Sequence, residues 1–405
     1  MPGWEIIGDD ERQAVNEVFD NGAVLFRQAF AGLRNNMYKV KDFEAAFAQF
    51  TQARYAHAVT SGTAALKVAL KAMRVGPGDE VVTQSHTFVA TVEAILECGA
   101  TPVIADVDWT LNMDPEDLER KLTPRTKVIL PVHMLGVACR MDEILAIARS
   151  HGVQVLEDTA QACGGTYHGR HLGTLGNAGT FSFDHGKFLT TGEGGMVITD
   201  EEPLYLRERS YADHGHEDNP AFPRGEDTRS FPGFNYRMME LQGAIGLVQL
   251  RKLPASIEQH RANKAALRAA LEERVGRRLR FREVPDSAGD TGDALVFFLD
   301  TPAQAKRVAR QLQRNGIGFK NLPDALNWHY AGTWDHMLAG MPWLRGRSLE
   351  EHLQQSGQIL RRAIALPIFY RMNEVRIATI AREVDAALRE SAEAPSQAVC
   401  ERAGG

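Results

Sequence analysis

Between Ser61 and Asp200, short runs of apolar and β-branched residues alternate with segments in which apolar residues recur at helical spacing. This alternation is typical of a parallel β-sheet covered by helices, and it constrains the fold more than any other feature of the chain. Right-handed crossovers bring the carboxyl ends of such strands to one crevice, so ligands are expected to bind there. The expected strands cover residues 80–84, 101–107, 126–133, 153–158, 180–184 and 194–200.

Two neighbouring segments are predicted to be helices. Residues 61–79 carry their apolar side chains on one face, begin at a capping Ser61 or Thr63 and end at Gly76-Pro77. Residues 141–152 form the second predicted helix, between the strands at 126–133 and 153–158. The predicted order of strand and helix therefore fits a layered α/β domain.

The pattern changes after about residue 250. Long charged helices and a strand–helix pattern replace the alternation, which predicts a smaller α+β domain. With 405 residues, 44% of them hydrophobic, the chain is large enough for two domains. We expect an N-terminal arm and a large cofactor-binding domain over residues 1–250, a small domain over 251–390 and a flexible tail over 391–405.

Charge and cysteine content narrow the possible partners. A formal net charge of -6 argues against a protein that neutralises many nucleic-acid phosphates, so small molecules are the expected ligands. The four cysteines are far apart and predict neither a disulfide framework nor a zinc site. There is no leader-like start and no apolar stretch of about 20 residues, so we expect a cytoplasmic protein without a membrane partner.

Three polar features converge on the predicted crevice. Asp158 ends a buried strand, Lys187 follows another strand, and Ser61, Gly62 and Thr63 open a helix whose free N–H groups suit a phosphate. Taken singly, each has an ordinary structural explanation: an ion pair, a solvated lysine or a helix cap. Together they match a pyridine ring with a phosphate arm, which needs a lysine for a Schiff base, a carboxylate and an anion-binding cup.

Other ligand motifs fail on spacing. Residues 179–188 end in Phe188 where a Walker loop requires serine or threonine, and residues 173–179 do not match the dinucleotide-binding glycine pattern. The histidine pair in Asp213–His216 has no matching ligand run nearby, so no metal site is expected.

Four stretches together resemble a known family. In order along the chain they are residues 61–66, 86–95, 157–200 and 233–250. They resemble the DegT/DnrJ/StrS sugar aminotransferases, which have the aspartate-aminotransferase fold (type I) and use pyridoxal 5'-phosphate. The resemblance extends from about Arg27 to Leu388. It implies a large α/β domain with a mainly parallel sheet, a smaller α+β C-terminal domain and a homodimer with active sites at the subunit interface.

By position within these motifs, the resemblance assigns the catalytic groups. Lys187 resembles the Schiff-base lysine, which also moves a proton between the substrate and cofactor carbons. Asp158 resembles the carboxylate that keeps the pyridine nitrogen protonated. Gln161 matches the side chain that bonds the cofactor's 3-hydroxyl, and Phe88 matches an aromatic ring stacked on the cofactor.

The resemblance also assigns the phosphate-binding groups. Gly62, Thr63 and Ser182 match the phosphate cup. Asn235 resembles a residue that reaches the phosphate from the partner subunit. This assignment makes each predicted active site dependent on two chains.

Histidines are the candidate substrate contacts. His329 and His133 match positions near the sugar pocket, and His214 lies in a loop that borders it. His185 is expected on the same side of the chain as Lys187. A buried histidine with satisfied hydrogen bonds is the alternative for His329 and, more strongly, for His133, while a local hydrogen bond is the alternative for His185.

The predicted function is transfer of an amino group, from an amino acid such as glutamate, to a keto- or aldehydo-sugar. Residues 1–15, 210–220 and 327–336 resemble the branch that makes 8-amino-3,8-dideoxy-octulosonate, an amino sugar of lipopolysaccharide, from a nucleotide-free aldehyde. A nucleotide-linked keto-sugar is the alternative acceptor. Lys187 stands where the dehydratases of the family carry histidine, so dehydration or another chemistry of this cofactor is a less favoured alternative, as is a regulator without cofactor.

The loop after residue 212 bears on the choice of acceptor. Asp213, Glu217 and Asp218 lie beside its histidines, and Arg224 and Arg229 are the nearest downstream cations. A nucleotide diphosphate needs a cationic surface, whereas one arginine suffices for a single carboxylate. The loop therefore predicts a preference for a nucleotide-free acidic sugar.

Overall fold

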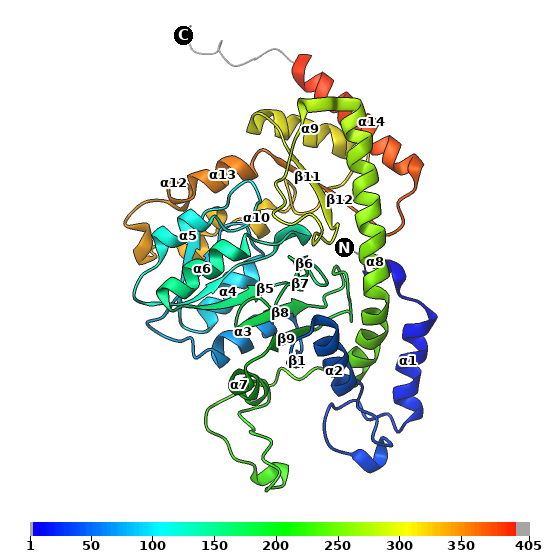
Figure 1. The fold of residues 1–405 in the computed structure, drawn as a ribbon, viewed down its shortest axis with the longest axis vertical. Helices are drawn as coiled ribbons and strands as arrows, with labels where there is room; N and C mark the ends of the chain where they lie inside the picture. The colour runs from blue at the N-terminus through cyan, green and yellow to red at the C-terminus, as the bar shows by residue number, and fades with distance from the viewer. Residues whose placement is uncertain (1–2, 394–405) are drawn as a thin grey trace, which may run out of the picture.

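The computed structural model describes residues 3–393. A large domain surrounds a seven-stranded sheet, a smaller domain surrounds a three-stranded sheet, and one long helix runs along both (Figure 1). The prediction of an α/β large domain with a mainly parallel sheet and a smaller α+β domain is confirmed. Among the described residues, no helix has the length and apolar content needed to cross a membrane.

The large sheet has the strand order β1-β9-β8-β5-β4-β2-β3. All of its strands are parallel to one another except β9, which is antiparallel to both of its neighbours. Its strands are β1 (Tyr55–Val59), β2 (Glu80–Gln84), β3 (Thr101–Ala105), β4 (Thr126–Leu130), β5 (Gln154–Asp158), β8 (Ala178–Ser182) and β9 (Gly195–Thr199). A two-stranded hairpin consists of β6 (Thr166–Tyr167) and β7 (Arg170–His171), and the small sheet consists of β10 (Arg280–Phe281), β11 (Ala294–Phe298) and β12 (Ala363–Pro367).

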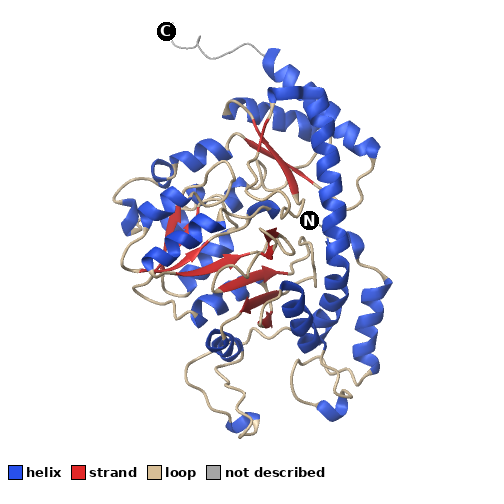
Figure 2. Ribbon diagram, viewed as in Figure 1, coloured by secondary structure: helices blue, strands red, loops and turns tan. Residues whose placement is uncertain are grey.

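Helices surround both sheets (Figure 2). The helices of the large domain and its arm are α1 (Asp9–Asp20), α2 (Lys39–Thr51), α3 (Gly62–Ala72), α4 (Val89–Glu97), α5 (Pro115–Lys121), α6 (Met141–His151) and α7 (Glu202–Ala212). The later helices are α8 (Glu240–Val275), α9 (Pro302–Arg314), α10 (Leu326–His329), α11 (Asp335–Leu338), α12 (Leu349–His352), α13 (Gln354–Leu360) and α14 (Glu374–Glu393).

The two faces of the large sheet bury different residues of the same strands. Val81 and Leu156 pack with α3 in one hydrophobic cluster, whereas their neighbours Val82 and Val155 pack with α5 and α6 in another. Successive side chains of a strand point to opposite faces, so strands covered on both faces must be apolar at nearly every position. This requirement explains the continuous apolar runs of the sequence.

The helix α8 passes through the predicted domain boundary at residue 250. It is 36 residues long, contains Pro254, and packs against α1 and α2 near its start and against α14 near its end. The predicted tail over 391–405 begins within α14, which extends to Glu393, and residues 394–405 lie outside the described part.

The small domain faces the carboxyl ends of the large sheet. Its antiparallel sheet packs with α9, α14 and the end of α8 in a separate hydrophobic cluster. The segment that follows α9, residues 315–331, reaches back to the large domain, where Ala331 N donates a backbone hydrogen bond to Ser85 O at 2.8 Å. This segment supplies side chains to the crevice above the large sheet.

Candidate active site

A cavity of about 380 Å³ lies at the predicted crevice. Eight of the twelve residues predicted for the cofactor and the substrate line it. They are Gly62, Thr63, Phe88, Asp158, Gln161, Ser182, Lys187 and His329. Residues far apart in the sequence therefore meet at one site, as the parallel-sheet topology requires.

The start of α3 forms an anion-binding cup. Ser61 caps the helix, and its Oγ accepts a hydrogen bond from Ala64 N at 3.1 Å. The backbone N–H groups of Gly62 and Thr63 make no hydrogen bond within residues 3–393, so they remain available to an anion at the positive end of the helix dipole. Ser182 packs closely against the cup, because a Cβ on Gly62 would lie only 2.7 Å from Ser182 Cβ.

Asp158 ends β5 and is almost fully buried. Its Oδ1 accepts a hydrogen bond from Ala160 N at 3.1 Å, and its Oδ2 accepts one from Thr91 Oγ1 at 2.9 Å. Burial raises the pKa of Asp158 above its ordinary value, although both hydrogen bonds and the charge of Lys187 oppose the change. A cation beside this carboxylate, such as a pyridinium, would restore its charge.

Lys187 follows β8 in a short turn, where its N–H donates to Asp184 O at 3.0 Å. Burial lowers the pKa of Lys187, and the nearby charge of Lys320 lowers it further, while Asp184 and Asp158 act in the opposite direction. An amine with a depressed pKa spends more time neutral, which suits both nucleophilic attack and proton transfer.

Two side chains are arranged to contact a planar ring. Gln161 Oε1 accepts hydrogen bonds from Leu135 N at 3.2 Å and from Asn321 Nδ2 at 3.3 Å, which leaves its Nε2 free to donate to a hydroxyl. Phe88 is 43% exposed in the cavity, and its ring lies 5.4 Å from that of His329. An exposed aromatic face of this kind can stack on a heteroaromatic ligand.

His329 is neutral at physiological pH. Burial lowers its pKa to about 4, and its Nδ1 donates to Ala325 O at 3.0 Å, which leaves Nε2 as an acceptor. His133, by contrast, is fully buried outside the cavity, where it bonds Glu157 Oε2 at 3.1 Å and accepts from Cys139 N at 3.1 Å. His133 is therefore a buried histidine with satisfied hydrogen bonds, which was the alternative to a substrate contact.

The other three predicted residues do not line the cavity. His185 is exposed and stacks on Trp4, with ring centroids 6.1 Å apart, and His214 is exposed in the loop after α7. Asn235 is also exposed, and within residues 3–393 its Oδ1 accepts a hydrogen bond only from Arg237 N, at 3.3 Å. A contact from Asn235 to a cofactor phosphate therefore remains a prediction that requires a second subunit.

Sequence reasoning missed five polar residues of the cavity, which are Thr91, Asp184, Glu193, Lys320 and Asn321. Lys320 and Asn321 come from the small domain, and Thr91 lies on the first turn of α4. Thr91 could have been found from its helical spacing to Phe88, which places both near the same end of that helix. Lys320 and Asn321 lie outside the four stretches that carry the family resemblance, so only the tertiary structure reveals them.

The structure also changes the interpretation of Arg224. Both oxygens of Asp213 accept hydrogen bonds from its guanidinium, at 2.7 and 2.8 Å. Asp213 also pairs with Arg237. Arg224 therefore pairs with a carboxylate of the chain itself and is not free to bind the carboxylate of a substrate.

Residues 6–385 match the model of the DegT/DnrJ/EryC1/StrS aminotransferase family. The chain belongs to this family. The resemblance inferred from the motifs is thereby confirmed, and membership of the family indicates pyridoxal phosphate as the cofactor. The octulosonate branch is not established by this match.

Two curated relatives are similar over part of their length. The chain is 43% identical over 241 residues to GDP-perosamine synthase of Caulobacter vibrioides, an alignment that covers 59% of this chain and 62% of that protein. It is 45% identical over 255 residues to the spore coat polysaccharide biosynthesis protein SpsC of Bacillus subtilis, which covers 61% of this chain and 63% of that one. The aligned part is thus under two thirds of either relative.

Similarity to solved structures covers nearly the whole chain. An aminotransferase from Psychrobacter cryohalolentis superposes with a TM-score of 0.82 at 29% identity, covering 95% of this chain and 98% of that one. This similarity confirms the predicted fold for both domains together.

The cavity fits pyridoxal phosphate on its own geometry. The unpaired N–H groups of Gly62 and Thr63 suit its phosphate, and the buried carboxylate of Asp158 suits its ring nitrogen. Phe88 offers a face to the ring and Gln161 a donor to its hydroxyl. Lys187 completes the set with an amine of lowered pKa.

Proposed function

We propose that this protein is a sugar aminotransferase, which moves an amino group from an amino acid to the carbonyl carbon of a sugar. The observation that carries the proposal is the shared cavity of Lys187, Asp158 and the cup at the start of α3. The names of the relatives, a perosamine synthase and a polysaccharide biosynthesis protein, support a sugar as acceptor.

Different residues of the cavity have different roles in the proposed reaction. When bound, pyridoxal phosphate supplies an electron sink that lets the donor amino acid lose its α-proton. As a neutral amine, Lys187 would take that proton and return it to a carbon of the cofactor. Thr91 and Ala160 hold the carboxylate of Asp158 in place by hydrogen bonds, and this carboxylate would keep the ring nitrogen of the cofactor protonated. The neutral His329 offers its Nε2 as an acceptor to substrate hydroxyl groups.

Glutamate is the proposed donor and 8-oxo-3,8-dideoxy-octulosonate the proposed acceptor, in the cytoplasmic synthesis of a lipopolysaccharide sugar. The support for an acidic acceptor is Lys320, a cation that lines the cavity and whose Nζ lies 3.9 Å from Asp293 Oδ1. A nucleotide-linked keto-sugar is the alternative acceptor, and the name of the perosamine synthase relative favours it.

We also propose a homodimer with shared active sites. Figure 1 shows the segments before α2 and after α7 extending from the same end of the large domain, and Arg224 bonds Gln28 between them at 2.6 Å. Large apolar side chains of these segments are exposed, as is Asn235. They are Phe30, Leu33, Phe222 and Phe234. A second subunit that covers them would bury apolar area and bring Asn235 to a neighbouring cavity.

The test begins with the purified protein loaded with cofactor. Borohydride should attach the cofactor irreversibly to the peptide that contains Lys187, and Lys187→Ala should abolish both labelling and turnover. Glutamate-dependent amination of a panel of nucleotide-free and nucleotide-linked sugars, read by mass, then identifies the acceptor. Labelling of another lysine would reject the site, whereas labelled Lys187 without amination of any sugar would reject the function.

A further inference from the structure

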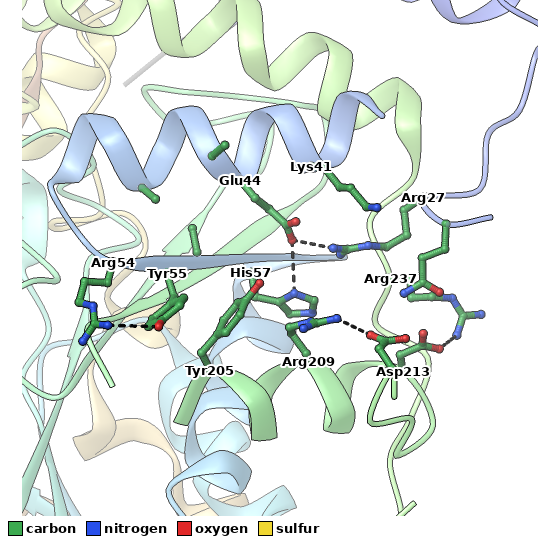
Figure 3. Close-up of a pocket in the computed structure, with 15 residues that line it drawn as sticks. Arg27, Lys41, Glu44, Arg54, Tyr55, His57, Tyr205, Arg209, Asp213 and Arg237 are labelled. Atoms are coloured by element: carbon green, nitrogen blue, oxygen red, sulfur yellow. Dashed lines mark hydrogen bonds and ion pairs between the residues drawn. The ribbon is translucent and has the colours of Figure 1, made fainter. Parts of the chain in front are cut away.

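A second cavity of about 380 Å³ lies at the open edge of the large sheet (Figure 3). The edge strand β1 forms its floor, with α2 on one side and α7 on the other. It shares no lining residue with the cavity that holds Lys187. We call it the edge pocket; its charged residues are Arg27, Lys41, Glu44, Arg54, Arg209, Asp213, Asp218 and Arg237, beside His57.

Glu44 is a buried acid of the edge pocket, and its charge is compensated by its neighbours. Its Oε1 accepts from Arg27 and from Ala58 N, both at 2.7 Å, and lies 3.3 Å from His57 Nδ1. Burial alone would raise the pKa of Glu44, but these partners outweigh it and the pKa falls to about 2. Glu44 therefore fixes Arg27 in the pocket and leaves no excess negative charge.

The other two acids are compensated as well. Asp218 accepts a hydrogen bond from Arg209 at 2.6 Å. Asp213 pairs with Arg237 and also with Arg224, so one carboxylate faces two guanidinium groups. These contacts satisfy the acids without using every cation of the pocket.

Lys41 and Arg54 are the surplus cations. Neither makes an ion pair with a carboxylate anywhere in residues 3–393. Lys41 Nζ lies 4.2 Å from the ring centroid of Tyr38, and the guanidinium of Arg54 makes only two long hydrogen bonds, each 3.4 Å, to Asp200 O and to Tyr55 Oη. Five cations thus face three carboxylates within one concave site.

This excess of positive charge is a local property of the pocket, since the whole chain carries a net charge of -6. A concave surface with unbalanced charge concentrates the field and attracts ions of opposite sign. Figure 3 shows Arg54 at one end of the pocket and Arg27 with Arg237 at the other, so the cations can contact a ligand from both ends. Phosphate groups, with several acceptor oxygens each, suit guanidinium and ammonium donors arranged in this way.

We propose that the edge pocket is a second ligand site, which binds a small molecule through its phosphate groups independently of the cofactor. A phosphorylated sugar and a free inorganic anion share this chemistry. Separate titrations with a hexose 1-phosphate, pyrophosphate and orthophosphate distinguish these sources.

The test uses the cofactor-loaded protein, so that the cup at the start of α3 is already filled. Calorimetric titration should show saturable binding of at least one of the three probes. In Lys41→Met with Arg54→Met, binding of that probe should weaken at least about tenfold, because two charge-assisted contacts are lost. Both side chains are exposed, so the melting temperature should be unchanged.

A matched control removes two cations elsewhere. Lys71 and Arg74 line a different pocket, beside α3 and α7, and Lys71→Met with Arg74→Met changes the net charge by the same amount. This control should bind the probe within about twofold of the unchanged protein. The proposal is overturned if no probe binds saturably, if the Lys41 and Arg54 changes have no effect, or if the control weakens binding equally.

Discussion

Asp158 lies at a depth where an isolated carboxylate would tend to hold a proton, because burial raises its pKa. The hydroxyl of Thr91 and the N–H of Ala160 offset part of that tendency. The charge of Lys187 also favours the carboxylate, and a protonated ring nitrogen of the bound cofactor would stabilise it further. The negative charge of Asp158 and a positive charge on the cofactor ring would therefore stabilise each other.

We expect Asp158→Asn to retain part of its cofactor and to lose about 10²–10³-fold in kcat, because a neutral amide does not stabilise a protonated ring. Thr91→Val removes only one hydrogen bond to the carboxylate and should cost about tenfold. Steady-state kinetics with absorbance of the bound cofactor measures both effects. Wild-type turnover in Asp158→Asn would remove this residue from the mechanism.

A second buried acid affects stability instead of catalysis. Glu208 on α7 is fully buried, and neither of its side-chain oxygens has a hydrogen-bond partner within residues 3–393. Burial raises its pKa to about 8. The folded state therefore holds this proton more tightly than the unfolded state, and the free energy of unfolding should fall as the pH rises from about 4.5 to about 8.

Glu208→Gln should remove this pH dependence, because the amide stays neutral at every pH. The variant should melt at a higher temperature than the unchanged protein at pH 8 and at nearly the same temperature at pH 4.5. Glu202→Gln, an exposed change on the same helix, is the control and should follow the unchanged protein at both pH values. Parallel melting curves for all three proteins would contradict the assignment to Glu208.

The active-site residues that lie within sequence motifs could be predicted from the sequence. Those that only the tertiary structure brings to the cavity could not. Asp158 and Lys187 each follow a strand whose carboxyl end must face the crevice, so local sequence and topology place them together. Lys320 lies 133 positions after Lys187, in the loop between α9 and α10, and only docking of the small domain brings it to the cavity.

At the scale of elements, the cup at the start of α3 depends on the close approach of α3 to β8. A Cβ on Gly62 would lie 2.7 Å from Ser182 Cβ and 3.0 Å from Ser182 Oγ, so a side chain cannot be added without moving one of the two elements. This constraint explains why glycine stands at the first position of the helix, where its N–H faces the anion site.

Gly62→Ala should therefore weaken cofactor binding about tenfold or more, because the cup must open to admit the methyl group. Gly76→Ala is a matched control, since nothing lies within 4 Å of the added atom. Equilibrium dialysis against pyridoxal phosphate measures the dissociation constant of each variant. Equal affinity in Gly62→Ala and Gly76→Ala would show that the start of α3 does not hold the phosphate.

The strands in the interior of the large sheet could be predicted from the sequence. The edge strand β1 and the continuous helix α8 could not. Six predicted strands occur where expected, because burial on both faces imposes apolar runs. The edge strand β1, Tyr55–Val59, contains His57 and two alanines, and pairing with β9 makes it a strand. The continuity of α8 through Pro254 likewise depends on packing against neighbouring helices, which outweighs the local cost of proline.

At the scale of the whole molecule, residues of both domains line the cavity. The small domain supplies Lys320 and His329, and the large domain supplies the cup and Lys187. Asn235, by contrast, is exposed and lies outside the cavity of its own chain. An exposed asparagine beside exposed apolar side chains fits a group that acts in a neighbouring subunit.

Hybrid dimers test this arrangement directly. Lys187→Ala has no functional amine, and Asn235→Ala should bind cofactor weakly because one phosphate contact is lost. If Asn235 acts in the neighbouring subunit, a mixed dimer contains one site with both changes and one site with neither. Mixing the two variants should therefore restore up to half of the normal activity per dimer. Native mass spectrometry must confirm that the mixed dimer forms; a confirmed mixed dimer without any gain in activity would place Asn235 in its own subunit's site.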